Sequence, residues 1–173
     1  MNRGLSTFRF AAIAAIGFVA LGASLSHAVD TKVIPGGLCF DGGGSPFRNG
    51  VGNLFNKSGT ESMLALCYLV RDNPAAKPTK VEVSVVDNSS ATGVKDISCF
   101  MRIANRFGSG AASGSTVSTT GVRPEGTVLN IPLPAANLAD GSIVVVCTIP
   151  RHGIGDANSA LASIKYTEVT PAP

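Results

Sequence analysis

His152 is the residue with the clearest chemical potential. It is the one histidine beyond residue 28, and Asp156 follows it in the same glycine-containing stretch. A histidine oriented by a carboxylate is the general base of a Ser-His-Asp triad when the fold brings a serine to it. No GxSxG turn accompanies the pair. His152 and Asp156 are therefore only catalytic candidates, and the favoured interpretation is an exposed loop histidine just after a strand.

Two acidic turns could supply oxygen ligands to calcium, one at Asp41 before a run of three glycines and one at Asp87 before Asn88. Calcium takes about six to eight oxygens, commonly from several carboxylates, and neither turn groups several acids. Asp87 is better explained as a turn former that hydrogen-bonds its own backbone. We expect no metal site, and no nucleotide-binding or other cofactor motif is present.

Two further functional classes find little support in the residues. Glycoside hydrolysis uses a pair of carboxylates, but the acids are spread through the chain, and we expect Glu82 and Glu168 to point outward. Carbohydrate-binding sandwiches often stack sugars on aromatic side chains. This chain has no tryptophan, and Tyr68 and Tyr166 are more easily placed in or beside the core. The carbohydrate-binding hypothesis is lowered but stays open.

The first 28 residues have the order of a cleavable signal peptide. Arg3 and Arg9 precede an apolar run from Phe10 to about Leu25, and Ala28 ends a small-residue cleavage site. The run is roughly 16 residues, short of the ~20 that span a membrane, although an uncleaved anchor is the alternative. Cleavage leaves residues 29–173 as a single secreted domain, periplasmic or extracellular, without membrane insertion.

The charge distribution argues against two partner classes. Removal of Arg3 and Arg9 lowers the formal net charge from +3 to +1, and the remaining charges are interspersed. Nucleic acid and anionic membranes call for a basic face. We expect neither as a partner, whereas a protein or a glycan remains open.

Four cysteines, Cys39, Cys67, Cys99 and Cys147, lie beyond the signal peptide. An even number in an exported chain predicts two disulfides. Their wide spacing resembles neither a zinc site nor a CxxC redox pair. Three connectivities are possible; we favour Cys39 with Cys67 and Cys99 with Cys147, and four buried free thiols are the alternative.

Alternation of apolar and polar residues predicts strands with one buried face. The pattern is clear in Val81–Val85, Ile97–Ile103 and Ile143–Ile149, and the last two place their cysteines on the apolar face. Met63–Val70 is apolar throughout. We prefer a strand there, although the Ser58–Glu61 pair resembles the capping box of a helix.

The rest of the chain supplies short strands and turns. The shorter strand candidates are Leu38–Phe40, Val51–Phe55, Val128–Ile131 and Ser163–Val169. Gly108–Gly121, made mostly of small residues, is predicted to be a loop, and a helical turn is expected near Ala135–Ala139. About eight short strands between Gly, Pro, Asn and Ser clusters indicate an all-β fold, an antiparallel β-sandwich of immunoglobulin-like or jelly-roll type.

The order of these signals along the chain resembles a loose group of uncharacterised bacterial secreted β-sandwich proteins. The segments that carry the resemblance are Asn56–Gly59, Cys67, Val81–Ser89, Ile97–Cys99, Val146–Pro150 and Ser163–Tyr166. The resemblance spans most of the mature chain. It implies the fold and no function.

The sequence therefore favours a secreted, non-enzymatic module with a binding or structural role outside the cytoplasm. The alternatives are a small secreted hydrolase that uses His152, and a calcium-dependent adhesion or carbohydrate-binding module. We expect contacts at the loops Asp41–Arg48, Asp87–Val94 and Arg151–Asn158. The candidate contact residues within them are Asp41, Arg48, Asp87 and Arg151.

Overall fold

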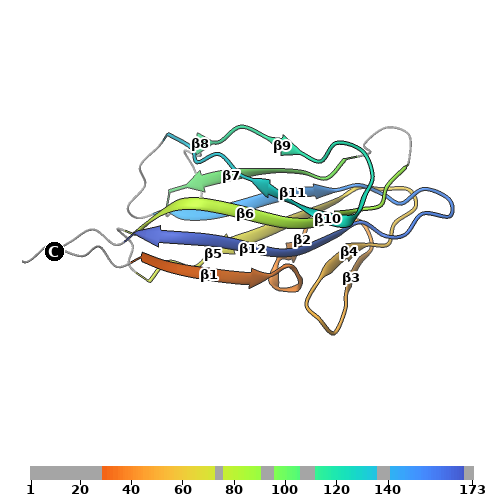
Figure 1. Cartoon of the computed structure of the whole chain (residues 1–173), viewed down its shortest axis with the longest axis horizontal. Helices are drawn as coiled ribbons and strands as arrows, with labels where there is room; N and C mark the ends of the chain where they lie inside the picture. The colour runs from red at the N-terminus through yellow and green to blue at the C-terminus, as the bar shows by residue number, and fades with distance from the viewer. Residues whose placement is uncertain (1–28, 73–75, 91–95, 106–111, 136–140, 170–173) are drawn as a thin grey trace, which may run out of the picture.

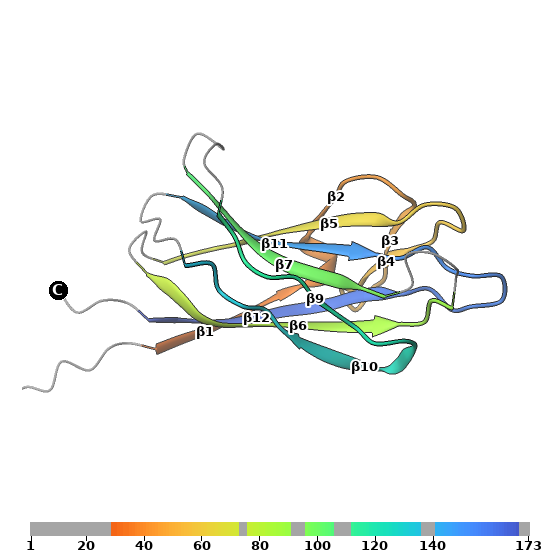
Figure 2. The same ribbon diagram turned by 90° about the horizontal axis from the view of Figure 1, so that it is seen from above.

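Two antiparallel sheets of six strands each form a β-sandwich, which confirms the predicted fold class (Figures 1 and 2). The computed structural model describes residues 29–72, 76–90, 96–105, 112–135 and 141–169. The expected signal peptide, and the expected helical turn apart from Ala135, lie outside these residues. No helix in the described ranges is long and apolar enough to cross a membrane.

Sheet A is built around β12, which hydrogen-bonds to three other strands. Its strands, in spatial order, are β10 (Arg123–Asn130), β6 (Lys77–Asp87), β12 (Ala160–Val169), β4 (Leu54–Asn56) and β3 (Pro46–Arg48), with β1 (Val29–Pro35) paired to β12. Sheet B is built around β11. Its strands are β2 (Phe40–Asp41), β5 (Met63–Leu69), β11 (Ser142–Ile149), β7 (Ser98–Ala104) and β8 (Ala112–Ser113), with β9 (Val117–Ser118) paired to β7.

One disulfide lies within sheet B and the other joins sheet B to the segment before β2, and this pairing is the one favoured from the sequence. Cys99 and Cys147 are direct neighbours in the β7–β11 register and are bonded to each other. Cys39 is bonded to Cys67 of β5. Cys39 follows the short 3-10 helix η1 (Gly36–Leu38) and precedes β2. All four cysteines are buried in the core.

The Met63–Val70 segment is a strand, as preferred, but its two faces differ. Met63, Ala65 and Cys67 of β5 are buried, while the residues between them point away from the core. Tyr68 is 49% exposed, so its expected place in or beside the core is wrong. Tyr166 of β12 is buried, as expected.

The strand count and several bounds differ from the sequence expectation. Twelve strands are described rather than about eight, and β1 was not foreseen because its residues mix charged and apolar types. Leu38 lies in the 3-10 helix instead of a strand. The predicted loop Gly108–Gly121 contains β8 and β9, which pair with β7. Small residues suffice there because an edge pairing uses backbone groups.

Asp87 is fully buried and joins the two sheets at the end of β6. Its Oδ1 accepts hydrogen bonds from Ser89 N (3.2 Å) and Ser159 Oγ (3.1 Å). Its Oδ2 accepts from Ile97 N (3.0 Å) and from Thr119 Oγ1. The turn-forming bond expected from the sequence is therefore present. Asp87 was also a candidate contact residue, and in the structure its carboxylate is buried and hydrogen-bonded within the protein.

Replacement of Asp87 by Ala should lower the free energy of unfolding by about 3 kcal/mol, because it leaves several buried donors without an acceptor. Chemical denaturation measures this change. Asp41→Ala, which removes an exposed acid and its ion pair with Arg48, should cost less than about 1 kcal/mol. Equal stabilities of the two variants would contradict the assigned role of Asp87.

Candidate functional site

The three loops expected to make contacts gather at one end of the sandwich. They meet around the segment between β4 and β5: Lys57 N donates to Ser45 O (2.8 Å), and His152 N donates to Ser58 O (3.1 Å). Ser89 Oγ donates to the Arg151 carbonyl at 2.7 Å. Of the Asp87–Val94 loop, residues 91–94 lie outside the described chain.

Asp41 and Arg48 are brought together by the loop that connects β2 to β3. The Arg48 guanidinium lies 2.9 Å from Asp41 Oδ1 and donates to the carbonyls of Gly37 (2.7 Å) and Cys39 (3.0 Å). These bonds fasten the loop to the 3-10 helix. Both side chains are exposed, but Asp41 is paired with Arg48, and Arg48 also stabilises the protein's own backbone.

His152 is not arranged as the base of a triad. Its Nδ1 lies 3.0 Å from the carbonyl of Gly153, and its Nε2 lies 3.1 Å from the carbonyl of Lys57. Both ring nitrogens thus face backbone oxygens. Among the described residues, no serine hydroxyl forms a hydrogen bond with the ring.

Asp156 instead holds the serine of the neighbouring loop. It accepts from Ser90 N (2.7 Å), from Ser90 Oγ (2.8 and 2.9 Å) and from Gly153 N (3.0 Å). The backbone and hydroxyl bonds of Ser90, then that of Gly153 and the nearby charge of His152, hold the Asp156 pKa below its ordinary value against the opposing effect of desolvation. Asp156 thus links the loop after β11 to the loop after β6, and we call this link the Asp156 clasp.

The outer face of sheet B carries a different kind of surface. A depression of about 240 Å³ opens on this face, and we refer to it as the sheet-B depression. Its lining residues are Leu66, Tyr68, Arg102, Ala104, Ser142, Val144 and Val146. They come from β5, β11 and β7, whose register places Tyr68, Val144 and Arg102 in one row across the sheet.

Two aromatic side chains border this depression. Phe40 is 62% exposed and forms an edge-to-face pair with Tyr68, with ring centroids 5.8 Å apart. Val144 and Val146 are largely covered and form an aliphatic floor. Arg102 is exposed and makes no hydrogen bond or ion pair with any described residue. The depression combines aromatic, aliphatic and cationic groups.

The sequence contained a signal that could have located this surface. The disulfide expected for Cys67 favours a position of this residue on the core side of its strand. Strand alternation then places Leu66 and Tyr68 on the opposite face. Because Met63–Val70 is apolar throughout, the sequence interpretation did not separate its two faces, and the exposed aromatic site was missed.

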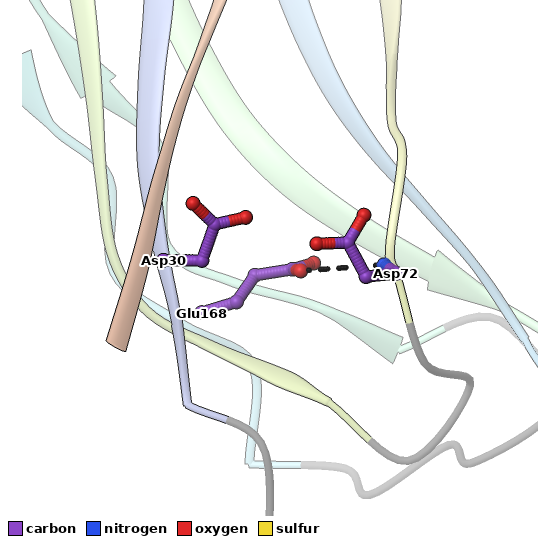
Figure 3. A group of neighbouring side chains, drawn as sticks. All are labelled: Asp30, Asp72 and Glu168. Atoms are coloured by element: carbon purple, nitrogen blue, oxygen red, sulfur yellow. Dashed lines mark hydrogen bonds between the residues drawn. The ribbon is translucent and has the colours of Figure 1, made fainter. Parts of the chain in front are cut away.

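A group of charged side chains lies at the end of the sandwich away from the loops, between the sheets. Asp30 of β1, Glu168 of β12 and Asp72, which follows β5, converge there (Figure 3). Lys32 of β1 lies among them, with Nζ 2.8 Å from Asp72 Oδ1 and 2.9 Å from Glu168 Oε2. We call these four residues the acidic cluster.

Glu168 is only 2% exposed, so the expectation that it points outward is wrong. It shares the inward face of β12 with Tyr166 and Ile164, which lie two and four residues earlier in the strand. Burial lowers the Lys32 pKa, but hydrogen bonds to Asp72 and Glu168 outweigh this effect and raise it above its ordinary value. The Lys32 ammonium, followed by Asp30, holds the pKa of Asp72 below its usual range.

No family model matches the chain, and no curated protein sequence does. Solved structures are similar at low identity. A family two carbohydrate esterase from Cellvibrio japonicus matches 84% of this chain with 13% identity and a TM-score of 0.43. An Arthrobacter globiformis T6 isomalto-dextranase complexed with panose matches 79% with 18% identity and a TM-score of 0.43.

A family 11 carbohydrate-binding module from Clostridium thermocellum, in complex with a mixed-linked tetrasaccharide, matches 80% of this chain with 10% identity and a TM-score of 0.40. The chain covers 87% of that module. It covers 36% of the esterase and 23% of the isomalto-dextranase, so it spans about a third and a quarter of their lengths.

The Asp156 clasp predicts a pH dependence. Because its folded pKa lies below the ordinary 3.8, its contribution to stability is fully present above that value and is lost as the pH falls through the lowered pKa. The difference in Tm between the wild type and Asp156→Asn should therefore be constant at neutral pH and shrink in acid. A difference that stays the same to the lowest pH at which both fold would contradict this role. Glu125→Gln, at an exposed acid of β10, is the control.

Proposed function

We propose that this protein is a non-enzymatic binding module that acts outside the cytoplasm and binds a saccharide at the sheet-B depression. The observation that carries the proposal is the exposed Phe40–Tyr68 pair beside an aliphatic floor and the unengaged Arg102. Loop residues expected to make contacts are instead occupied with internal hydrogen bonds.

Folding alone does not account for the residues on this face. The inward residues of β5, β11 and β7 already form the core, and the exposed face of an antiparallel sheet is commonly polar. Here a row across the sheet joins Phe40, Leu66, Val146 and Phe100. A sizeable apolar surface rimmed by polar groups is typical of a ligand or partner site.

The shape and chemistry favour a sugar ring over a large partner surface. The depression is below the roughly 300 Å³ at which small-molecule pockets begin, so it fits a ring-sized group. A sugar ring has an apolar C–H face, which suits the Tyr68 ring and the valine floor. Its hydroxyls, or the carboxylate of an acidic sugar, can accept hydrogen bonds from Arg102.

The two disulfides indicate maturation in an oxidising, extracytoplasmic compartment, where many glycans are met. The expected signal peptide would direct the chain there. The proposal needs neither a nucleophile nor a cofactor, and both ring nitrogens of His152 lie against backbone carbonyls.

Glycan-array screening of the exported protein, followed by calorimetric titration with the best ligand, tests the proposal. Tyr68→Ala and Arg102→Ala should each weaken binding about tenfold, a typical loss for an aromatic or arginine anchor. Phe47→Ala is the matched control, because Phe47 is an exposed aromatic residue on the other sheet and should leave affinity unchanged.

Two results would reject the saccharide proposal. One is the absence of any array ligand for a folded protein. The other is binding that survives both substitutions in the depression. Capture of a protein partner that Tyr68→Ala abolishes, with no glycan bound, would assign the same surface to protein recognition instead.

A further inference from the structure

We propose that Asp30, Asp72 and Glu168 form a calcium site that fastens β1 and β12 of sheet A to the end of β5 in sheet B. One carboxylate oxygen from each residue lies within 4.8 Å of the others. Figure 3 shows the three side chains converging from three separate segments. This site is independent of the proposed saccharide surface, which uses other residues on the outer face.

The buried carboxylate of Glu168 is the observation that points to a cation-binding site. Its Oε2 contacts Lys32 Nζ at 2.9 Å. Its Oε1 is buried and has no hydrogen-bond partner in the described chain. A buried carboxylate oxygen left unsatisfied is costly, and a bound ion is one of the recognised ways in which such a group is satisfied.

The charge count leaves room for a second cation. Three ionised carboxylates against the single ammonium of Lys32 leave an excess of two negative charges, which one divalent ion would neutralise. Lys32 is part-buried but reaches the surface, so its flexible side chain can move outward. It currently contacts the Val70 carbonyl at 3.2 Å. That oxygen also accepts a hydrogen bond from Tyr166, and its other lone pair would become available as a fourth ligand.

Calcium fits the spacing better than magnesium. Calcium binds oxygen at about 2.4 Å, so ligands on opposite sides of the ion lie up to about 4.8 Å apart. Magnesium, at about 2.1 Å, demands a tighter and more regular shell. Three carboxylates, one carbonyl and water molecules give the mixed, irregular oxygen set that calcium accepts.

In this proposal the Lys32 ammonium and the calcium ion compete for the same carboxylates. Without calcium its ammonium bridges Asp72 and Glu168; with calcium it is displaced, and the divalent ion links the same groups. The proposal predicts that Lys32→Met binds calcium about tenfold tighter or more, because one nearby positive charge is removed. It also predicts that this variant depends on calcium more strongly for its stability.

Terbium, a calcium analogue excited through tyrosine, provides a direct readout. Tyr166 donates a hydrogen bond to the Val70 carbonyl, and its ring centroid lies 6.0 Å from Lys32 Nζ, so a bound ion would lie near its ring. We expect saturable terbium emission that calcium displaces. Asp72→Asn and Tyr166→Phe should abolish it, whereas Tyr68→Phe and Asp41→Asn should retain it.

Thermal unfolding with calcium or with a chelator gives the second measurement. Millimolar calcium should raise the Tm of the wild type by several degrees, raise that of Lys32→Met further, and leave Asp72→Asn unchanged. Asp72 is exposed, so its variant should fold. The proposal is overturned if calcium changes neither terbium emission nor the Tm, or if Asp72→Asn responds as the wild type does. Should Lys32→Met fail to fold, the wild type and Asp72→Asn still decide.

Discussion

The rest of the structure depends on the register of β11 between β5 and β7. Alternate residues of a strand face opposite sides, so a slip of one residue would exchange the buried and exposed faces of β11. Val145 and Cys147 would leave the core, and Cys147 would no longer face Cys99. The disulfide between these neighbours therefore selects the register that also places Val144 and Val146 on the outer face.

That register has a functional consequence, because β5 and β11 carry apolar residues on both faces. The inward set is required for the sandwich to fold. The outward set is unusual, because the outer face of an antiparallel sheet is commonly polar. Phe40 and Tyr68 extend this outward set toward the edge of sheet B. The surface that folding does not require is the one best suited to contact a ligand.

Strand alternation in the sequence was sufficient to predict the sandwich, since β6, β7 and β11 have clear patterns. The sequence interpretation failed where the alternation of inward and outward residues was not extended to the next residues of the same strand. The parity of Cys67 places Tyr68 outside, and that of Tyr166 places Glu168 inside. The acidic cluster could not be predicted from the sequence, because Asp30, Asp72 and Glu168 are brought together only by the pairing of β1 with β12 and by the packing of the two sheets.

The two buried carboxylates at opposite ends of the sandwich show what folding can and cannot satisfy. Asp87 receives hydrogen bonds on both oxygens from backbone amides and hydroxyls of both sheets, so it needs no counter-ion. Glu168 is buried to a similar extent but meets mainly Lys32 and two other acids, and one of its oxygens has no donor in the described chain. The same fold can saturate a buried carboxylate with neutral donors, as it does at Asp87. At Glu168 it supplies further negative charge instead, which is the environment that binds a cation.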